Sequence, residues 1–254
     1  MRNVIVLGCG RSGTSLTAGL FSKAGYFMGP RLHLPDPSNP KGFFESAEIN
    51  QLNEALIAGA ISPFSRLLDV VRSRKKFLKN KNFWLAQIPL KMKIPATAGL
   101  IQKMQGLTAK RPYCFKDPRF CYTLPVWRPH LSVDFIFLCV FREPWKTAQS
   151  IVQECRKREH LRWLGMDFKR ALAIWRSCYA HVLKTHRYEG QWMFVHYEQL
   201  FEETTLERLG CLTGSRLDSQ FPDVALRKRV NAIPISKKER LLYHELCELA
   251  GYIQ

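Results

Sequence analysis

The sequence predicts an α/β protein in which a central parallel sheet is flanked by helices. Two stretches carry this prediction: an apolar strand over residues 4–7 that runs into a glycine-rich turn and a helix, and the most apolar strand of the chain, over 134–141, whose residues 135–141 are all apolar. Strands buried on both faces of a parallel sheet have such uninterrupted apolar runs. With 254 residues, 46 % of them hydrophobic, and no linker or internal repeat, residues 1–254 are expected to form one domain.

Further elements follow from the spacing of apolar residues. Short strands are expected over 113–115 and 191–196, and helices over 15–24, 166–188 and 237–250. Four prolines fall between Gly29 and Gly42, which indicates a constrained loop. In an open parallel sheet such a loop lies near the ligand crevice, where it can contact a substrate.

The chain is strongly basic. It has 39 Lys and Arg against 21 Asp and Glu, a formal charge of +18. The basic residues are scattered, without a recognisable nucleic-acid module, so nucleic acid is not an expected partner. A multiply charged nucleotide or an acidic acceptor accounts for part of the excess, and solvated helix faces such as the run from Arg72 to Lys81 account for the rest.

Membrane insertion and metal binding are not expected. No run of 18 apolar residues exists, and the first residues lead directly into a strand, which favours a cytoplasmic protein. The eight cysteines include no Cys-x-x-Cys pair, and neither they nor the seven histidines have the spacing of metal ligands. Cys9 is the one thiol for which a lowered pKa is expected, because it lies beside a helix N-terminus.

The turn after the first strand predicts an anion site. Glycines at 8, 10 and 13 let the backbone N–H groups approach a ligand, and the following helix adds the positive end of its dipole. The spacing fits both a dinucleotide fingerprint and a phosphate loop whose lysine is replaced by Thr14. The first reading requires an acid about 20 residues on at the end of a second strand. The first acid is Asp36, inside the proline-rich loop, so phosphate is favoured over a dinucleotide or an ordinary tight turn.

Two signatures together resemble a known family. Arg11-Ser12-Gly13-Thr14-Ser15 resembles the 5′-phosphosulfate loop of sulfotransferases that use 3′-phosphoadenosine 5′-phosphosulfate. The strand over 135–141 ends in Arg142, and Ser150 follows eight residues later, as in the family's 3′-phosphate site. The alternative for Arg142 is an ion pair with Glu143 or another acid.

The resemblance implies a P-loop nucleotide-kinase-like fold with about five parallel strands, and transfer of a sulfuryl group to an acceptor hydroxyl or amine without a metal. Tyr197, which follows a strand, matches the family tyrosine beside the adenine, and residues 221–229 loosely match a late basic segment. The implied nucleotide-binding residues are Gly10, Arg11, Ser12, Gly13, Thr14, Ser15, Arg142, Ser150, Tyr197, Arg227 and Arg229. The product would be 3′-phosphoadenosine 5′-phosphate.

Two carboxylates compete for the role of the base that deprotonates the acceptor. Glu45 lies in a segment, 39–45, that resembles one common in bacterial-type sulfotransferases; its alternative role is to favour the start of the next helix. Asp117 lies in Lys-Asp-Pro-Arg at a strand end, where the alternative is a local turn. Arg11 and Lys116 are expected to offset charge on the bridging oxygen.

Other functions remain open. A P-loop kinase would need a lysine at Thr14 and an acid for magnesium, and a nicotinamide or flavin oxidoreductase would need the second-strand acid. The hypothesis of a non-catalytic polyanion-binding protein depends on the +18 charge alone. The acceptor is not identified by any motif, and residues 57–110 carry no functional signal.

Overall fold

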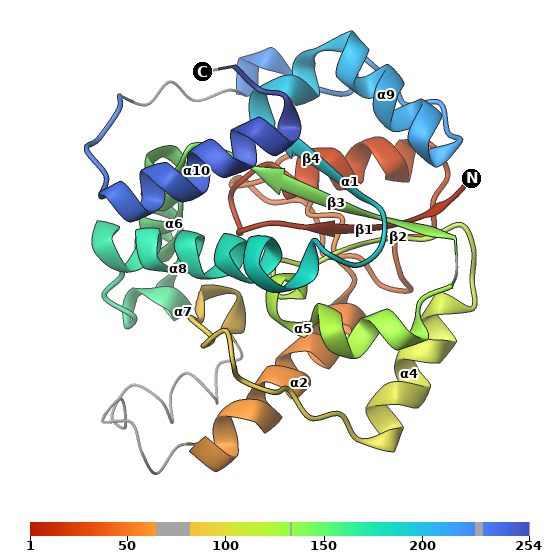
Figure 1. The fold of residues 1–254 in the computed structure, drawn as a ribbon, viewed down its shortest axis with the longest axis horizontal. Helices are drawn as coiled ribbons and strands as arrows, with labels where there is room; N and C mark the ends of the chain where they lie inside the picture. The colour runs from red at the N-terminus through yellow and green to blue at the C-terminus, as the bar shows by residue number, and fades with distance from the viewer. Residues whose placement is uncertain (65–81, 133, 227–230, 254) are drawn as a thin grey trace.

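The protein is built on a four-stranded parallel sheet. The computed structural model describes residues 1–64, 82–132, 134–226 and 231–253 (Figure 1). The strands are β1 (Asn3–Leu7), β2 (Cys114–Lys116), β3 (Phe135–Phe141) and β4 (Trp192–His196), in the order β2-β1-β3-β4. All three pairings are parallel, with Val4 opposite both Cys114 and Ile136. The carboxyl ends of the strands therefore share one edge of the sheet, where α/β proteins bind ligands.

The expected number of strands, about five, is corrected to four in the part of the chain that is described. The segment at 26–28 joins the sheet through one bridge, between Phe27 and Tyr113. Gly25 and Gly29 flank it at φ +87° and +113°, and these turns end the extended backbone before a ladder can form. A single bridged residue does not make a second strand, and a dinucleotide site requires an acidic residue at the end of such a strand.

Helices cover both faces of the sheet (Figure 1). They are α1 (Thr14–Lys23), α2 (Ala47–Phe64), α4 (Ala98–Thr108), α5 (Phe120–Trp127), α6 (Pro144–Lys157), α7 (Glu159–Arg162), α8 (Phe168–His181), α9 (Glu203–Thr213) and α10 (Lys237–Ala250). Val4 and Val6 pack with α1 and α9, whereas Ile5 and Leu7 pack into a larger core with α2, α5, α6 and α8. This division follows from the alternation of side chains along a strand. Within the described ranges, no helix has both the length and the apolar character that crossing a bilayer requires.

The passage from β1 into the glycine turn predicts a strong effect for one substitution. Gly8 has φ +149°, and a Cβ there would lie less than 3.0 Å from the Val140 carbonyl oxygen of the neighbouring strand. We expect Gly8→Ala to lower the free energy of unfolding by about 2–4 kcal/mol, measured by urea denaturation. Gly106→Ala is the matched control, because its Cβ meets nothing within 4 Å in α4, and we expect a gain of up to about 1 kcal/mol. Equal stability of Gly8→Ala and the native protein would contradict this account of the turn.

Candidate functional site

A cavity of about 580 Å³ opens at the carboxyl edge of the sheet. Eight of the predicted nucleotide-binding residues line it: Gly10, Arg11, Gly13, Thr14, Ser15, Arg142, Ser150 and Tyr197. Glu45 and Lys116 line it as well. Arg227 and Arg229 fall outside the described residues. The strand tips of β1, β2 and β3 thus bring motifs that are far apart in the sequence to one cavity.

The glycine turn leaves helix α1 with open N–H groups at the cavity. Gly13 is the N-cap residue at φ 98°, and its position carries no capping side chain. Arg11 has φ 72°, which is uncommon for a residue with a side chain and recurs at ligand sites. A Cβ on Gly13 would lie 2.5 Å from Cδ2 of Tyr197, so the tyrosine ring packs directly on the turn. These features match an anion site formed by a turn and a helix N-terminus.

Ser12 differs from the other residues of the turn. It is fully buried, does not line the cavity, and its hydroxyl lies 3.2 Å from the Thr147 hydroxyl of α6. Its backbone N–H donates to the carbonyl of Cys9 at 3.2 Å. In this geometry the side chain of Ser12 holds the turn against α6, and the cavity is lined by the residues on either side of it.

Two basic side chains reach the cavity from different strand tips. Arg11 Nε donates to the Ser150 hydroxyl at 3.2 Å, so the turn after β1 touches the helix after β3. The guanidinium of Arg142 lies 4.4 Å above the ring centre of Tyr197. Its Nε is buried without a hydrogen-bond partner, and the carboxylate of Glu143 is 3.8 Å away. An oxyanion beside Arg142 would supply the missing acceptor.

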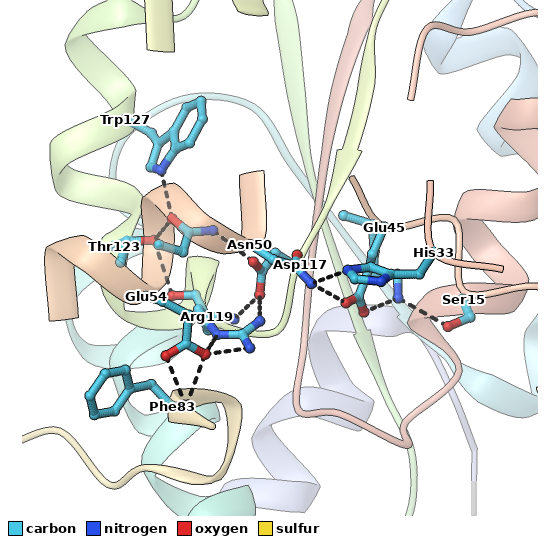
Figure 2. A network of polar contacts seen from close by, with 12 residues as sticks. Ser15, His33, Glu45, Asn50, Glu54, Phe83, Asp117, Arg119, Thr123 and Trp127 are labelled. Atoms are coloured by element: carbon cyan, nitrogen blue, oxygen red, sulfur yellow. Dashed lines mark hydrogen bonds and ion pairs between the residues drawn. The ribbon is translucent and has the colours of Figure 1, made fainter. Parts of the chain in front are cut away.

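Glu45 and Lys116 form a buried ion pair beside the turn (Figure 2). Lys116 Nζ donates to a Glu45 oxygen and, at 3.0 Å, to the hydroxyl of Ser15, while Asn50 Nδ2 donates to Glu45 Oε2 at 2.9 Å. Burial by itself raises the pKa of Glu45, but the Lys116 ammonium outweighs it and leaves that pKa below its ordinary value. Glu45 is therefore a carboxylate at neutral pH, in contact with the residue that also holds Ser15.

Helix α2 begins without help from Glu45. Its first-turn acid is Glu48, whose carboxylate accepts from the Ser46 hydroxyl and from the Arg31 backbone at 2.6 and 3.3 Å. Although burial opposes it, hydrogen bonds from Ser46 and Arg31 lower the pKa of Glu48 to about 2. The alternative role of Glu45 as the helix-start acid is thus filled by another residue.

Asp117 lies apart from the cavity. Its carboxylate is fully buried and accepts from Arg119 Nη1 and Asn53 Nδ2, each at 2.9 Å (Figure 2). Burial raises its pKa, and the pairing with Arg119 only partly opposes this. Arg119 also binds Glu54 at 2.5 Å, and Glu54 accepts from the Phe83 N–H at 3.0 Å. This geometry makes Asp117 a structural anchor between β2 and α2.

Cys9 does not have the acidic thiol that its position before a helix predicts. It is fully buried, and burial together with the neighbouring Cys178 thiol raises its pKa well above the ordinary value. The backbone of Cys9 lies at the turn, but the thiol faces the core away from the helix dipole. In the described ranges, no group of three or more His, Cys, Asp and Glu side chains has the arrangement of a metal site.

The proline-rich loop covers the cavity, as its position predicts. Asp36 forms an ion pair with Arg158, which follows the last residue of α6, and the carbonyl of Ser38 accepts from Arg11 Nη2 at 3.2 Å. Three lining residues carry no sequence signal: Asn50, Asn82 and Trp84. Trp84 lies over the turn, since a Cβ on Gly10 would be 2.7 Å from its Cε3.

Solved structures with the same architecture were found by comparison of the whole chain. The sulfotransferase domain from the Synechococcus PCC 7002 olefin synthase matches with a TM-score of 0.52 and 15 % identity, over 99 % of this chain and 95 % of that one. The sulfotransferase domain from the curacin biosynthetic pathway matches with a TM-score of 0.53 and 16 % identity, over 100 % and 99 %. The chain has a sulfotransferase fold. The fold expected from the two signatures is thereby confirmed.

Comparisons of the sequence itself give no match. No family model matches the chain, and no curated protein matches it. The sulfotransferase fold is therefore recognised through the spatial arrangement of the helices and strands. At a sequence identity this low, a shared fold does not establish a shared activity.

Proposed function

We propose that this chain is a sulfotransferase that moves a sulfuryl group from 3′-phosphoadenosine 5′-phosphosulfate to a hydroxyl or amine of an acceptor. The observation that carries the proposal is that two predicted anion sites line one cavity. The turn of β1 and the Arg142 tip of β3 both line it, and Arg11 touches Ser150 between them. A nucleotide with phosphates at both ends of its ribose matches two basic sites that share one cavity.

The residues divide between binding and chemistry. In the proposal, the N–H groups of the turn bind the 5′-phosphosulfate, Arg142 and Ser150 bind the 3′-phosphate, and Tyr197 lies beside the adenine. Arg11 and Lys116 offset charge that develops on the bridging oxygen. Glu45 takes the proton of the acceptor, because its carboxylate is ionised and lines the cavity, whereas Asp117 is enclosed.

Calorimetric titration with 3′-phosphoadenosine 5′-phosphate tests this assignment. Without magnesium, we expect the native protein to bind the nucleotide with a micromolar dissociation constant. Arg142→Ala should weaken binding about 10- to 100-fold, because a charge-assisted phosphate contact is lost. Arg208→Ala, an exposed position in α9, is the charge-matched control and should leave the affinity unchanged.

The same titration separates the competing functions. Tight binding of ATP with magnesium, without binding of the bisphosphate, would instead support a P-loop kinase. Tight binding of NAD would support an oxidoreductase. Equal weakening by Arg142→Ala and Arg208→Ala would indicate a general polyanion effect and would remove the basis of the proposal.

A further inference from the structure

Two buried polar atoms at the cavity lack hydrogen-bond partners. Asn82 is only 8 % exposed, lines the cavity, and its Nδ2 makes no hydrogen bond. Asn50 also lines the cavity, and its Oδ1 is buried without a partner. Buried polar groups are rarely left unpaired, and exceptions at a cavity point to a ligand. Asn82 Nδ2 can donate a hydrogen bond, and Asn50 Oδ1 can accept one.

The charged groups beside them are already paired. Lys116 binds Glu45 and Ser15, and Arg119 binds both Asp117 and Glu54. In this part of the cavity, among the residues that the structure describes, the polar atoms still without partners are the amide atoms of Asn50 and Asn82, and these are neutral. A neutral ligand matches them, since an anion here would compete with the carboxylates for the same cations.

The two asparagines lie close to helix α2, one on it and the other next to a residue that it binds. Asn50 donates to Glu45, the proposed base, through its other amide atom at 2.9 Å. Asn82 immediately precedes Phe83, and the Phe83 N–H donates to the carboxylate of Glu54. Glu54 lies on α2, one helical turn after Asn50 (Figure 2). Trp84, two residues further on, adds apolar surface next to the turn. This subsite runs from the base along α2 toward the helix at Phe83–Leu85.

We propose that this subsite recognises a neutral polyol, an acceptor with at least one hydroxyl besides the one that reacts. A hydroxyl both accepts and donates. Its oxygen would accept from Asn82 Nδ2, and a hydroxyl hydrogen of the same ligand would be donated to Asn50 Oδ1. The ring or chain carbons would lie against Trp84. This inference rests on the proposed function only in treating the ligand as the acceptor of the reaction. The binding site itself is inferred from the unpaired amide atoms.

Ligand-observed saturation-transfer NMR tests the subsite with two probes that share a six-membered carbon ring, myo-inositol and cyclohexanol. Both in the presence and in the absence of 3′-phosphoadenosine 5′-phosphate, we expect myo-inositol to bind at least about 10-fold more tightly than cyclohexanol. Asn82→Ala should weaken myo-inositol binding about 5-fold and leave cyclohexanol unchanged. Asn82→Asp should also weaken it, because the carboxylate donates no hydrogen. Asn231→Ala, exposed and outside the cavity, is the control.

The outcomes are separable. Equal binding of the two probes, or an unchanged affinity for myo-inositol in Asn82→Ala, overturns the polyol subsite. Thermal melting of each variant shows that it is folded before the titration is interpreted. A protein that binds myo-inositol through Asn82 but not the bisphosphate nucleotide would retain the subsite and lose the sulfotransferase proposal. The reverse result would retain the sulfotransferase proposal and lose the subsite.

Discussion

Glu45→Gln is expected to lower the turnover of sulfuryl transfer about 10²- to 10⁴-fold. The amide keeps the size of the side chain and can still accept from Asn50, but it cannot take a proton from the acceptor. The ion pair with Lys116 is lost as well, so the affinity for 3′-phosphoadenosine 5′-phosphate must be measured on the same preparation. We expect that affinity to change less than about 5-fold, because one neutral partner, Ser15, still holds the lysine. Transfer of labelled sulfate to a hydroxyl acceptor found by screening is the measurement.

Asp117→Asn is the matched control. It removes the other candidate carboxylate, which is enclosed by Arg119 and Asn53. We expect turnover to stay within about 5-fold of the native value, with a loss of about 1–3 kcal/mol in the free energy of unfolding. A fall in turnover of about 100-fold or more for Asp117→Asn, with near-normal turnover for Glu45→Gln, would assign the proton transfer to Asp117 instead.

The pH dependence of the reaction adds an independent check on Glu45. Its pKa is below the ordinary 4.5, so the carboxylate is ionised throughout the neutral range and is protonated only as the pH falls through that lowered pKa. Any loss of kcat/KM that this group causes is therefore confined to acid conditions. A carboxyl group with a raised pKa, as at Asp117, would place the loss at higher pH.

That the glycine turn, Arg142 and Ser150 line one cavity could be predicted, because the signals are local. A strand, a glycine turn and the next helix lie within residues 3–23. Arg142 directly follows β3, and Ser150 lies within the first two turns of α6. The strand bounds differ from the predicted ones by one residue, and α10 has its predicted bounds. Short-range patterns of this kind indicate both whether a segment is a helix or a strand and at which of its ends the polar residues lie. Ser12 was the exception, because its contact with Thr147 depends on how α6 packs.

The part of the cavity lined by Asn50, Asn82 and Trp84 could not be predicted from patterns. Asn50, Asn82 and Trp84 line one cavity because distant segments pack together, and one of the contacts is the hydrogen bond from the backbone at Phe83 to Glu54 on α2, across 29 residues of chain. The buried thiol of Cys9 illustrates the same limit, since its neighbour Cys178 comes from α8. Asp117 and Glu45 were indistinguishable as sequence, and they differ in burial and partners once the sheet is formed.

Arg119→Met is expected to cause the largest loss of stability, about 3–5 kcal/mol. Arg119 is 5 % exposed and is the shared cation of two buried carboxylates, Asp117 and Glu54. Methionine keeps much of the volume but leaves both carboxylates without their charge partner. The free energy of unfolding from urea denaturation is the measurement, and a loss below about 1 kcal/mol would contradict the anchoring role of the cluster.

The loss should depend on pH in a defined direction. Burial already raises the pKa values of Asp117 and Glu54 in the folded protein, and removal of Arg119 raises them further. A group whose pKa is higher in the folded than in the unfolded state favours folding at low pH, and that contribution is lost as the pH rises through the folded pKa. Arg119→Met should therefore be less destabilising at about pH 5, where the two carboxyl groups take up protons more readily, than at about pH 8.

Adding Glu54→Gln to Arg119→Met removes one of the two unpaired charges, and we expect the double variant to recover part of the lost free energy of unfolding at the higher pH. Equal losses at both pH values, with no recovery in the double variant, would show that the side chain of Arg119 acts by packing and that its charge contributes little.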